Sequence, residues 1–401
     1  MQEKVAGGAE GNRTPDLCSA IAALSHLSYG PATGGVLTAL SGSGNGFSDL
    51  GRRRGKILRN GGIPMKAWHL TRRPQGLPTI DNFALRDLPD TPLEKDQLRV
   101  RNRWISVDPY MRGRMNDAKS YAASFQLDQP MTGGAIGEVL ESRMDGFAPG
   151  DLILHMGGWR EGGVVGLDMM PNKLPTALLD AGLPPQTFLH NMGLTGGTAW
   201  IGLLRVAAAK PGDTVFVSAA AGAVGSAVVQ IAKAREMTVI GSAGGAEKCA
   251  WVTELGADAV IDYKAGPVLP QLAAALERLG KGGIDVYFDN VGGEHLDAAF
   301  AVANDFARFA ICGMIDVYND ARPQEMKYLI RTIPARIRME GFIYTDQFID
   351  CMEEFYADMS GQLASGAVTI RETVHQGIEA APDAFLGLFS GENIGKMLVR
   401  L

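Results

Sequence analysis

The stretch TVFVSAAAGAVGSAVVQ, from Thr214 to Gln230, decides the fold. It begins as a β-branched apolar run typical of a buried strand, and after a turn of small residues it places Val224, Val228 and Ile231 on one face of a helix. A strand that enters a helix through residues without bulk lets main-chain N–H groups approach a pyrophosphate, which the positive end of the helix dipole stabilises. The stretch therefore predicts a bound dinucleotide.

The small residues of this turn are spaced Ala220-x-Gly222-x-x-Gly225, so that an alanine replaces the first glycine of the usual G-x-G-x-x-G fingerprint. The spacing alone also fits an ordinary junction between a strand and a helix. The next strand, Thr238 to Ser242, ends without the carboxylate that binds the adenosine ribose of NAD, and Lys248 follows it. Because a cation suits a ribose 2′-phosphate, NADP(H) is favoured over NAD(H), although Lys248 also fits a solvated lysine in the first turn of a helix.

The composition is that of a globular protein long enough for two domains. Of the 401 residues, 46% are apolar and 20% are charged. The net charge of −6 argues against nucleic acid as a partner, because phosphate binding needs a concentrated basic surface. No apolar segment approaches the roughly 18 residues needed to cross a membrane. The four cysteines form no C-x-x-C pair and predict reduced thiols in a cytoplasmic protein: Cys18, Cys249, Cys312 and Cys351.

Residues 1–64 differ from the rest of the chain. They are rich in Gly and Ser and include SGSGNG (Ser41 to Gly46) and the basic GRRRGK (Gly51 to Lys56). Such a segment buries too little apolar surface to offset its ordering entropy, so we expect a disordered leader. A targeting peptide is one alternative, and a start of translation at Met65 is the interpretation we prefer.

The remaining sequence predicts two interleaved domains in an α/β fold. From 65 to 187, short apolar runs such as Gln97 to Val107 alternate with turn signals, which indicates a barrel-like domain of antiparallel strands. From 188 to 344, strands alternate with stretches of helical length, which is typical of a doubly wound parallel sheet. Residues 345–401 end in a strand, Lys396 to Leu401, that we expect to return to the first domain. This order places the ligand site in the cleft between the domains.

Seven motifs follow one another along this part of the chain: VDPYMRGRM (Val107 to Met115), GLTGGTAW (Gly193 to Trp200), AAAGAVGS (Ala219 to Ser226), ELGADAVIDYK (Glu254 to Lys264), YFDNVGGE (Tyr287 to Glu294), ICGMIDVYN (Ile311 to Asn319) and GENIGKMLV (Gly391 to Val399). In this order they resemble the medium-chain dehydrogenase/reductase superfamily, and within it the zinc-independent branch of NADP-dependent prostaglandin reductases, alkenal double-bond reductases and curcumin reductases. The resemblance covers nearly everything from Met65 to Leu401. It implies a GroES-like β-barrel catalytic domain, a Rossmann domain, and pairing as a homodimer through the Rossmann sheets.

The resemblance also implies a set of site residues. Those expected to bind NADP(H) are Gly222, Ala223, Val224 and Gly225 at the pyrophosphate, Lys248 and Tyr263 at the 2′-phosphate, and Asn290, Cys312 and Asn393 at the nicotinamide half. Tyr318 resembles a tyrosine near the substrate carbonyl, and Tyr110 resembles a second residue that lines the pocket. Plain structural interpretations stay open for the asparagines, which could occupy left-handed turns beside glycines, and for the tyrosines, which fit turns or strand ends.

We expect no metal. Relatives that oxidise alcohols hold zinc through Cys and His side chains, whereas the segment from 65 to 187 contains only His69 and His155 and no cysteine. The sequence GGAIGEV (Gly133 to Val139) stands about where those relatives carry a histidine. The histidines His155, His190 and His295 fit no ligand spacing and are expected at the surface or as hydrogen-bonded residues of the core.

Without a metal, an unconjugated ketone is hard to activate, whereas an enone or enal is reducible because negative charge moves from the β-carbon to the carbonyl oxygen. We therefore expect an NADPH-dependent enzyme that reduces the α,β-double bond of small enones and enals, with Tyr318 stabilising the enolate. A zinc-independent quinone oxidoreductase is the alternative among enzymes. A nucleotide-sensing or RNA-binding protein on a reductase fold is the alternative of another class, and the acidic net charge argues against it.

Overall fold

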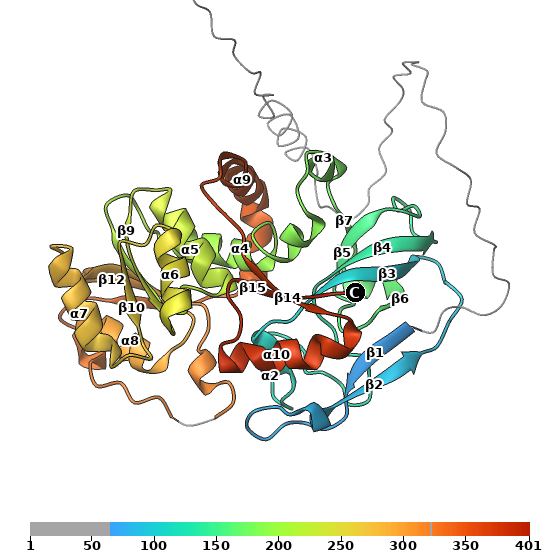
Figure 1. Cartoon of the computed structure of the whole chain (residues 1–401), viewed down its shortest axis with the longest axis horizontal. Helices are drawn as coiled ribbons and strands as arrows, with labels where there is room; N and C mark the ends of the chain where they lie inside the picture. Colours follow the sequence, from blue (N-terminus) through green and yellow to red (C-terminus); the bar gives the residue numbers. More distant parts are fainter. Residues whose placement is uncertain (1–64, 321–322) are drawn as a thin grey trace, which may run out of the picture.

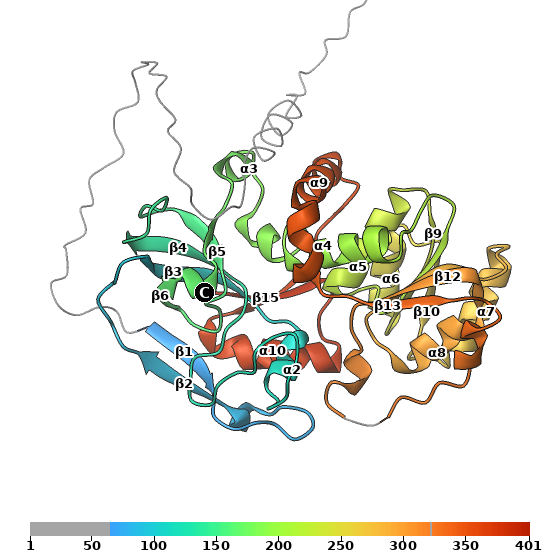
Figure 2. The ribbon, with the colours of Figure 1, turned by 180° about the vertical axis from the view of Figure 1, so that it is seen from behind.

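The computed structural model describes residues 65–320 and 323–401 and divides them into two lobes (Figure 1). The parallel sheet forms one lobe, on the left of Figure 1, and the antiparallel strands form the other. Helices α4 (Leu194–Trp200), α9 (Tyr344–Ser365) and α10 (Ala381–Ser390) lie between them, as the view from behind also shows (Figure 2). The predicted leader and Cys18 lie outside the described residues.

The first lobe is built on a six-stranded parallel sheet of order β10-β9-β8-β11-β12-β13. The strand order reverses between β8 and β11, as it does in dinucleotide-binding folds. The predicted doubly wound sheet is therefore confirmed. The strands are β8 (Thr214–Val217), β9 (Thr238–Ala243), β10 (Ala259–Asp262), β11 (Ile284–Asp289), β12 (Ala303–Ile311) and β13 (Arg338–Gly341).

Helices cover both faces of this sheet. The helices that follow its strands are α5 (Ala223–Lys233), α6 (Ala246–Glu254), α7 (Val268–Arg278) and α8 (Gly293–Ala301). Helix α7 buries Val268, Leu272 and Leu276, which are spaced four residues apart and form one stripe along the helix. Helix α9 adds Phe355, whose ring contacts that of Trp200 in α4. The two faces of the sheet thus belong to separate hydrophobic clusters, one with α7 and α8 and the other with α4, α5 and α9.

The second lobe contains a seven-stranded sheet of order β14-β15-β3-β4-β5-β7, in which β6 also pairs with β3. All its pairs are antiparallel except β14 with β15. The strands are β3 (Gln97–Ser106), β4 (Ala135–Ser142), β5 (Leu152–His155), β6 (Gly162–Gly166), β7 (Asn172–Lys173), β14 (Glu372–Gln376) and β15 (Lys396–Arg400). Because Leu398 of β15 faces Ser106 of β3, the last strand of the chain lies in the same sheet as β3, β4 and β5.

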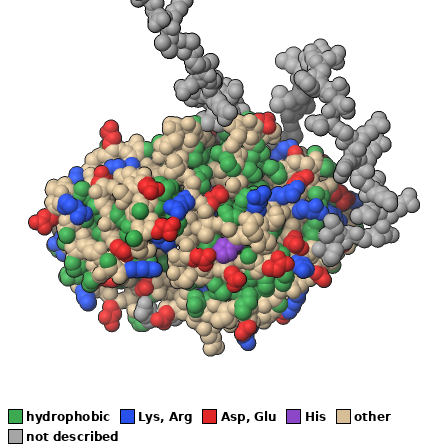
Figure 3. Space-filling view, viewed as in Figure 1, with side chains coloured by type: hydrophobic (Ala, Val, Ile, Leu, Met, Phe, Trp, Pro, Cys, Tyr) green, Lys and Arg blue, Asp and Glu red, His purple; other side chains and the backbone are tan. Residues whose placement is uncertain are grey.

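Two strands and two short helices also belong to this lobe. Strands β1 (Met65–Leu70) and β2 (Phe83–Leu88) form a separate antiparallel pair. The short helices are α2 (Tyr110–Arg114) and α3 (Thr176–Asp180). Across the face seen in Figure 3, acidic and basic side chains are interspersed rather than segregated. Within the described ranges, no helix combines the length and apolar character that a membrane span requires.

Candidate active site

The residues predicted to bind the cofactor follow the carboxyl ends of the parallel strands. Gly222 comes after β8, Lys248 after β9, Tyr263 after β10, Asn290 after β11 and Cys312 after β12. The carboxyl ends of parallel strands share one edge of a sheet, and in open α/β sheets ligands bind outside that edge where the strand order reverses. The structure therefore brings these five residues to one side of the parallel sheet.

The turn from β8 to α5 is shaped by small residues. Ala219 has a φ of +48°, and a Cβ atom at Gly225 would lie 2.3 Å from the carbonyl oxygen of Ala219. A larger residue at 225 would therefore push the helix away from the strand. Gly222 precedes α5 without a side-chain cap, so the N–H groups of Ala223 and Val224 are available at the positive end of the helix.

Asn393 reaches this turn from the other lobe. The N–H of Gly395 donates to the carbonyl oxygen of Ala221 at 2.7 Å, and Gly395 forms an isolated parallel bridge with Gly222. The side-chain amide of Asn393 donates to the carbonyl oxygen of Gly395 at 3.0 Å. The segment that leads into β15 therefore lies against the glycine-rich turn, and Asn393 lies beside both.

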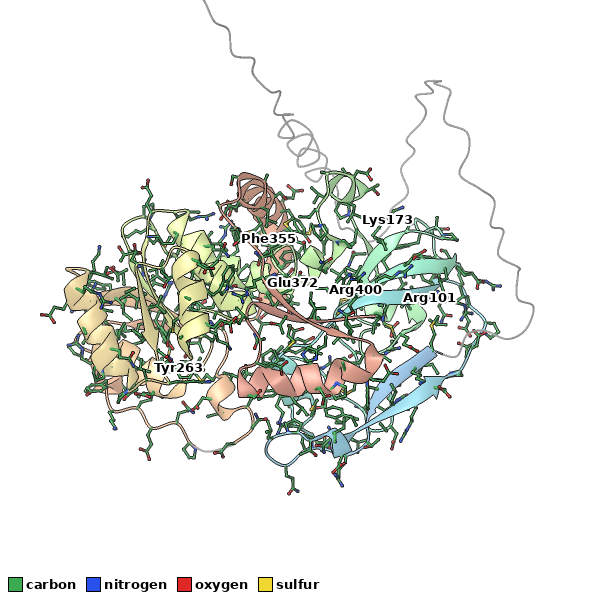
Figure 4. All side chains as sticks on the ribbon, in the orientation of Figure 1. Arg101, Lys173, Tyr263, Phe355, Glu372 and Arg400 are labelled. Carbon is green, nitrogen blue, oxygen red and sulfur yellow. The ribbon has the colours of Figure 1, made fainter. Side chains whose placement is uncertain are left out.

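Two cations lie together beyond β9. The strand ends at Ala243 without a carboxylate, and burial and the charge of Lys264 lower the pKa of Lys248 below its ordinary value. Tyr263, labelled in Figure 4, packs so closely on Gly244 that a Cβ atom there would lie 2.6 Å from the hydroxyl oxygen of Tyr263. Lys248 and Lys264 carry like charges that repel each other, and such a pair is a suitable site for an anion such as a 2′-phosphate.

Asn290 and Cys312 lie at the ends of adjacent strands. The N–H and the side-chain amide of Asn290 both bond to Ser218, each at 2.8 Å, and the N–H of Cys312 donates to the carbonyl oxygen of Asp289 at 2.9 Å. Burial and the Asp289 charge raise the pKa of Cys312 to about 12, so its thiol stays protonated at neutral pH. Neither Asn290 nor Asn393 has a positive φ, which removes the left-handed turn as the reason for either residue.

A group of buried polar side chains at the start of α4 was not predicted from the sequence. His190 and Asn191 are each 1% exposed and Thr195 is 6% exposed. Their side-chain polar atoms have no hydrogen-bond partner in the described part of the chain, although His190 lies beside the backbone of Ala223. His190 is therefore a core histidine, as expected, but its ring nitrogens lack the hydrogen bonds of normal geometry that were expected with it. Buried polar groups without partners are costly, and this group beside α5 fits a polar ligand such as a dinucleotide.

Tyr318 lies at the end of a short turn, η5 (Ile315–Val317), that follows β12. A Cβ atom at Gly313 would lie 2.8 Å from its hydroxyl oxygen, so the ring folds back over the end of the strand. Burial and the neighbouring Cys312 and Tyr121 raise the pKa of Tyr318 above its ordinary value. The phenol therefore stays protonated, and it can donate a hydrogen bond, well above neutral pH.

Tyr110 opens α2 on the opposite lobe. Burial and the Asp108 charge raise its pKa, and its hydroxyl interacts with the guanidinium of Arg114. Tyr121, on the loop after α2, is electrostatically coupled to Cys312, Arg114 and Asp108, which places it near the two predicted tyrosines. The sequence analysis missed Tyr121, because a tyrosine that is 64% exposed in an irregular loop carries no periodic signal.

A buried ion pair anchors the start of α2. The Nζ of Lys396, which is 2% exposed, donates to Oδ1 of Asp108 at 2.6 Å and to the carbonyl oxygen of Val107 at 3.1 Å. The hydroxyl of Ser106 donates to the other carboxylate oxygen of Asp108. Since Lys396 begins β15, this pair fixes α2 relative to the strand whose leading segment contacts the glycine-rich turn.

Comparisons with known proteins agree with this geometry. Residues 66–171 match a family described as the N-terminal domain of oxidoreductase, and residues 223–360 match one described as zinc-binding dehydrogenase. The NADPH-dependent curcumin reductase of Escherichia coli (strain K12) is 36% identical over 342 residues, which are 84% of this chain and 96% of the relative. The 2-alkenal reductase (NADP(+)-dependent) of Nicotiana tabacum is 40% identical over 302 residues, 75% of this chain and 86% of the relative.

A solved structure extends the likeness to three dimensions. CurA from Vibrio vulnificus in complex with NADPH is 41% identical and superposes with a TM-score of 0.76, covering 84% of this chain and 98% of that chain. The chain belongs to the zinc-independent branch of the medium-chain dehydrogenase/reductase superfamily.

Two buried histidines, His155 and His295, pair with polar side chains of the protein. Nε2 of His155 pairs with Oδ1 of Asn102 at 2.9 Å, and burial lowers the pKa of His155 to about 3. Nε2 of His295 pairs with the hydroxyl of Ser242 at 2.8 Å. No cluster of three or more His, Cys, Asp or Glu residues suited to a metal occurs between 65 and 320 or between 323 and 401.

Proposed function

We propose that this protein is an NADPH-dependent reductase of the α,β-double bond of small enals and enones. Two observations together support the proposal. Most of the chain is similar to reductases of curcumin and of 2-alkenals, and the protonated Tyr318 lies at the carboxyl end of the parallel sheet. Curcumin and 2-alkenals share a carbonyl conjugated to a carbon–carbon double bond. The substrate therefore supplies its own path for negative charge from the β-carbon to oxygen.

The residues fit NADP(H). The pyrophosphate would lie on the N–H groups of Ala223 and Val224, with Gly222 and Gly225 allowing close approach. Lys248 and Tyr263 would bind the 2′-phosphate. The nicotinamide half would lie near Asn290, Cys312 and Asn393, beside the unpartnered polar group at the start of α4. When bound, the cofactor supplies the hydride.

The chain's own side chains then stabilise and position the substrate. Tyr318 donates a hydrogen bond to the carbonyl oxygen, where negative charge develops, and its raised pKa keeps that proton available. Tyr110 and Tyr121 enclose the substrate from the opposite lobe and hold its double bond in place. Tyr318 or water protonates the α-carbon.

The same proposal covers assembly and location. Residues 65–187 and 345–401 would form the catalytic domain and residues 188–344 the nucleotide-binding domain. Strand β13 is an exposed edge of the parallel sheet, near apolar side chains that are 69% and 73% exposed at Ile330 and Ile333, which supports a homodimer formed through this edge. The free thiols of Cys249, Cys312 and Cys351 support a reducing, cytoplasmic environment.

The test is a comparison of substrates under one assay. NADPH oxidation is followed with a 2-alkenal, a curcumin-like enone and a benzoquinone, and the organic products are identified by mass spectrometry. We expect the saturated aldehyde and ketone, with benzoquinone turned over more slowly. Fast reduction of the quinone without reduction of either double bond would assign the chain to quinone oxidoreductases instead. Light scattering checks the dimer.

A further inference from the structure

Arg112 is a buried arginine whose hydrogen bonds join three segments of the chain. Its side chain belongs to α2, and the residue is 4% exposed. Nε donates to Oδ1 of Asn319 at 3.0 Å, Nη1 to Oδ1 of Asn116 at 2.7 Å, and Nη2 to the carbonyl oxygen of Gly76 at 2.8 Å. Asn319 follows the parallel sheet, whereas Asn116 and Gly76 belong to the antiparallel lobe. One guanidinium therefore fastens the two lobes at this point.

The hydrogen bonds of Arg112 add little to the stability of the fold, but they fix the positions of the segments that they join. Burial lowers the pKa of Arg112, which reflects the cost of taking the cation out of water, and its three acceptors are neutral oxygens. A well-packed apolar side chain would avoid that cost. A planar guanidinium, however, directs its N–H groups along fixed lines, which a flexible or apolar side chain does not.

The segment that Arg112 holds contains the tyrosine of the proposed reaction. Asn319 directly follows Tyr318, and the backbone bond from Tyr318 to Ile315 is long, at 3.3 Å. Gly76, with a φ of +76°, brings its loop to the backbone of Asn319, so that a Cβ atom there would lie 3.8 Å from the Asn319 carbonyl oxygen. The direction of the Tyr318 ring thus depends on a short turn held from outside by Arg112.

We propose that Arg112 is a positioning residue: by holding Asn319 it aims the Tyr318 hydroxyl at the substrate carbonyl. The inference rests on the proposed function of Tyr318 as hydrogen-bond donor. Arg112 acts through Tyr318 and needs no contact with the substrate. Tyr318 belongs to the lobe with the parallel sheet, and Arg112 belongs to the other lobe. The direction of the Tyr318 hydroxyl therefore depends on how the two lobes are placed relative to each other.

The experiment is a mutant cycle on 2-alkenal reduction. Arg112→Gln and Asn319→Ala should each lower kcat about 10- to 100-fold, the effect of a misplaced reacting group, with NADPH binding measured by fluorescence unchanged within about twofold. Arg112→Lys keeps the charge but loses the planar guanidinium with its fixed N–H directions, so it should behave like Arg112→Gln. Asn319→Asp keeps the acceptor and should stay near the unaltered enzyme. Arg73→Gln is the matched control, because Arg73 bonds the nearby Met115 carbonyl and not Asn319.

The decisive comparison uses Tyr318→Phe. If Arg112 acts through Tyr318, the double variant Arg112→Gln/Tyr318→Phe is no slower than Tyr318→Phe alone, and hydrogen exchange at residues 315–319 is faster in Arg112→Gln. Multiplicative losses, or full activity in Arg112→Lys, would overturn the role of Arg112 while leaving that of Tyr318 intact. An unaltered rate in Tyr318→Phe would instead refute the proposed function of Tyr318. If Arg112→Gln does not fold, Asn319→Ala is judged by the same criteria.

Discussion

Replacing Lys248 by alanine should weaken NADPH binding and leave NADH binding nearly unchanged. A hydrogen bond to a charged partner contributes about 1.5–3 kcal/mol, and Lys248 is partly buried, so most of that contribution should survive solvent screening. Because Lys264 repels the Lys248 charge, we take a value in the lower part of this range and expect Lys248→Ala to weaken NADPH binding by ~2 kcal/mol, which is about 30-fold in Kd. The assay is titration of each cofactor by fluorescence, repeated at two salt concentrations.

The pH dependence gives a second check on the same residue. Lys248 must be charged to attract a 2′-phosphate, and its pKa is lowered by burial and by Lys264. NADPH affinity should therefore fall as the pH rises through this lowered pKa, with no matching change for NADH. Lys210→Ala is the control, because it removes an equal charge just before β8, at the opposite edge of the sheet. If Lys248→Ala weakened the binding of NADPH and NADH equally, so that the ratio of their Kd values stayed the same, the assignment of Lys248 to the 2′-phosphate would be refuted.

Three other changes test separate parts of the structure. Gly225→Ala would place a Cβ atom 2.3 Å from the Ala219 carbonyl oxygen, so we expect a loss of about 1–3 kcal/mol in the free energy of unfolding together with weaker NADPH binding; an unaltered melting temperature would contradict this. Lys396→Met leaves Asp108 buried without its cation and should cost about 3–5 kcal/mol in urea unfolding, most of which the double variant with Asp108→Asn should restore. Tyr318→Phe should lower kcat for a 2-alkenal about 10²- to 10³-fold with little change in NADPH affinity, and a full rate would remove its proposed role.

The parallel-sheet lobe could be predicted from the sequence because its signals are local. The stretch from Thr214 to Gln230 gives β8 and α5 through a change from a β-branched run to helical spacing, and the structure places the helix at Ala223–Lys233. Most residues expected at the cofactor come directly after the carboxyl end of a parallel strand. Their common location can therefore be predicted from the order of strands and helices along the chain. Their contacts with NADP(H) stay a prediction.

The rest of the site depends on contacts between distant residues. Arg112 and Asn319 are separated by 207 positions, so no spacing within either motif indicates that they bond. His190 is an isolated histidine in the sequence, and only the packing of α4 against α5 reveals that its ring is buried without a partner. Tyr121 lies on an irregular loop. In each case the chemistry comes from tertiary packing, which periodicity does not encode.

The motif VDPYMRGRM, from Val107 to Met115, is rich in polar residues because helix α2 within it needs contacts with the rest of the chain. A helix of five residues is far too short to be stable alone, since isolated helices below about 12–15 residues are marginal, and its place must be fixed by contacts outside it. Asp108 before the helix binds Lys396, Met111 packs into the hydrophobic cluster of the second lobe, and Arg112 reaches Asn319. The same restraints orient Tyr110. Within this set, Arg112 alone reaches the segment after Tyr318, through Asn319, whereas the Asp108–Lys396 pair and Met111 hold the helix to its own lobe.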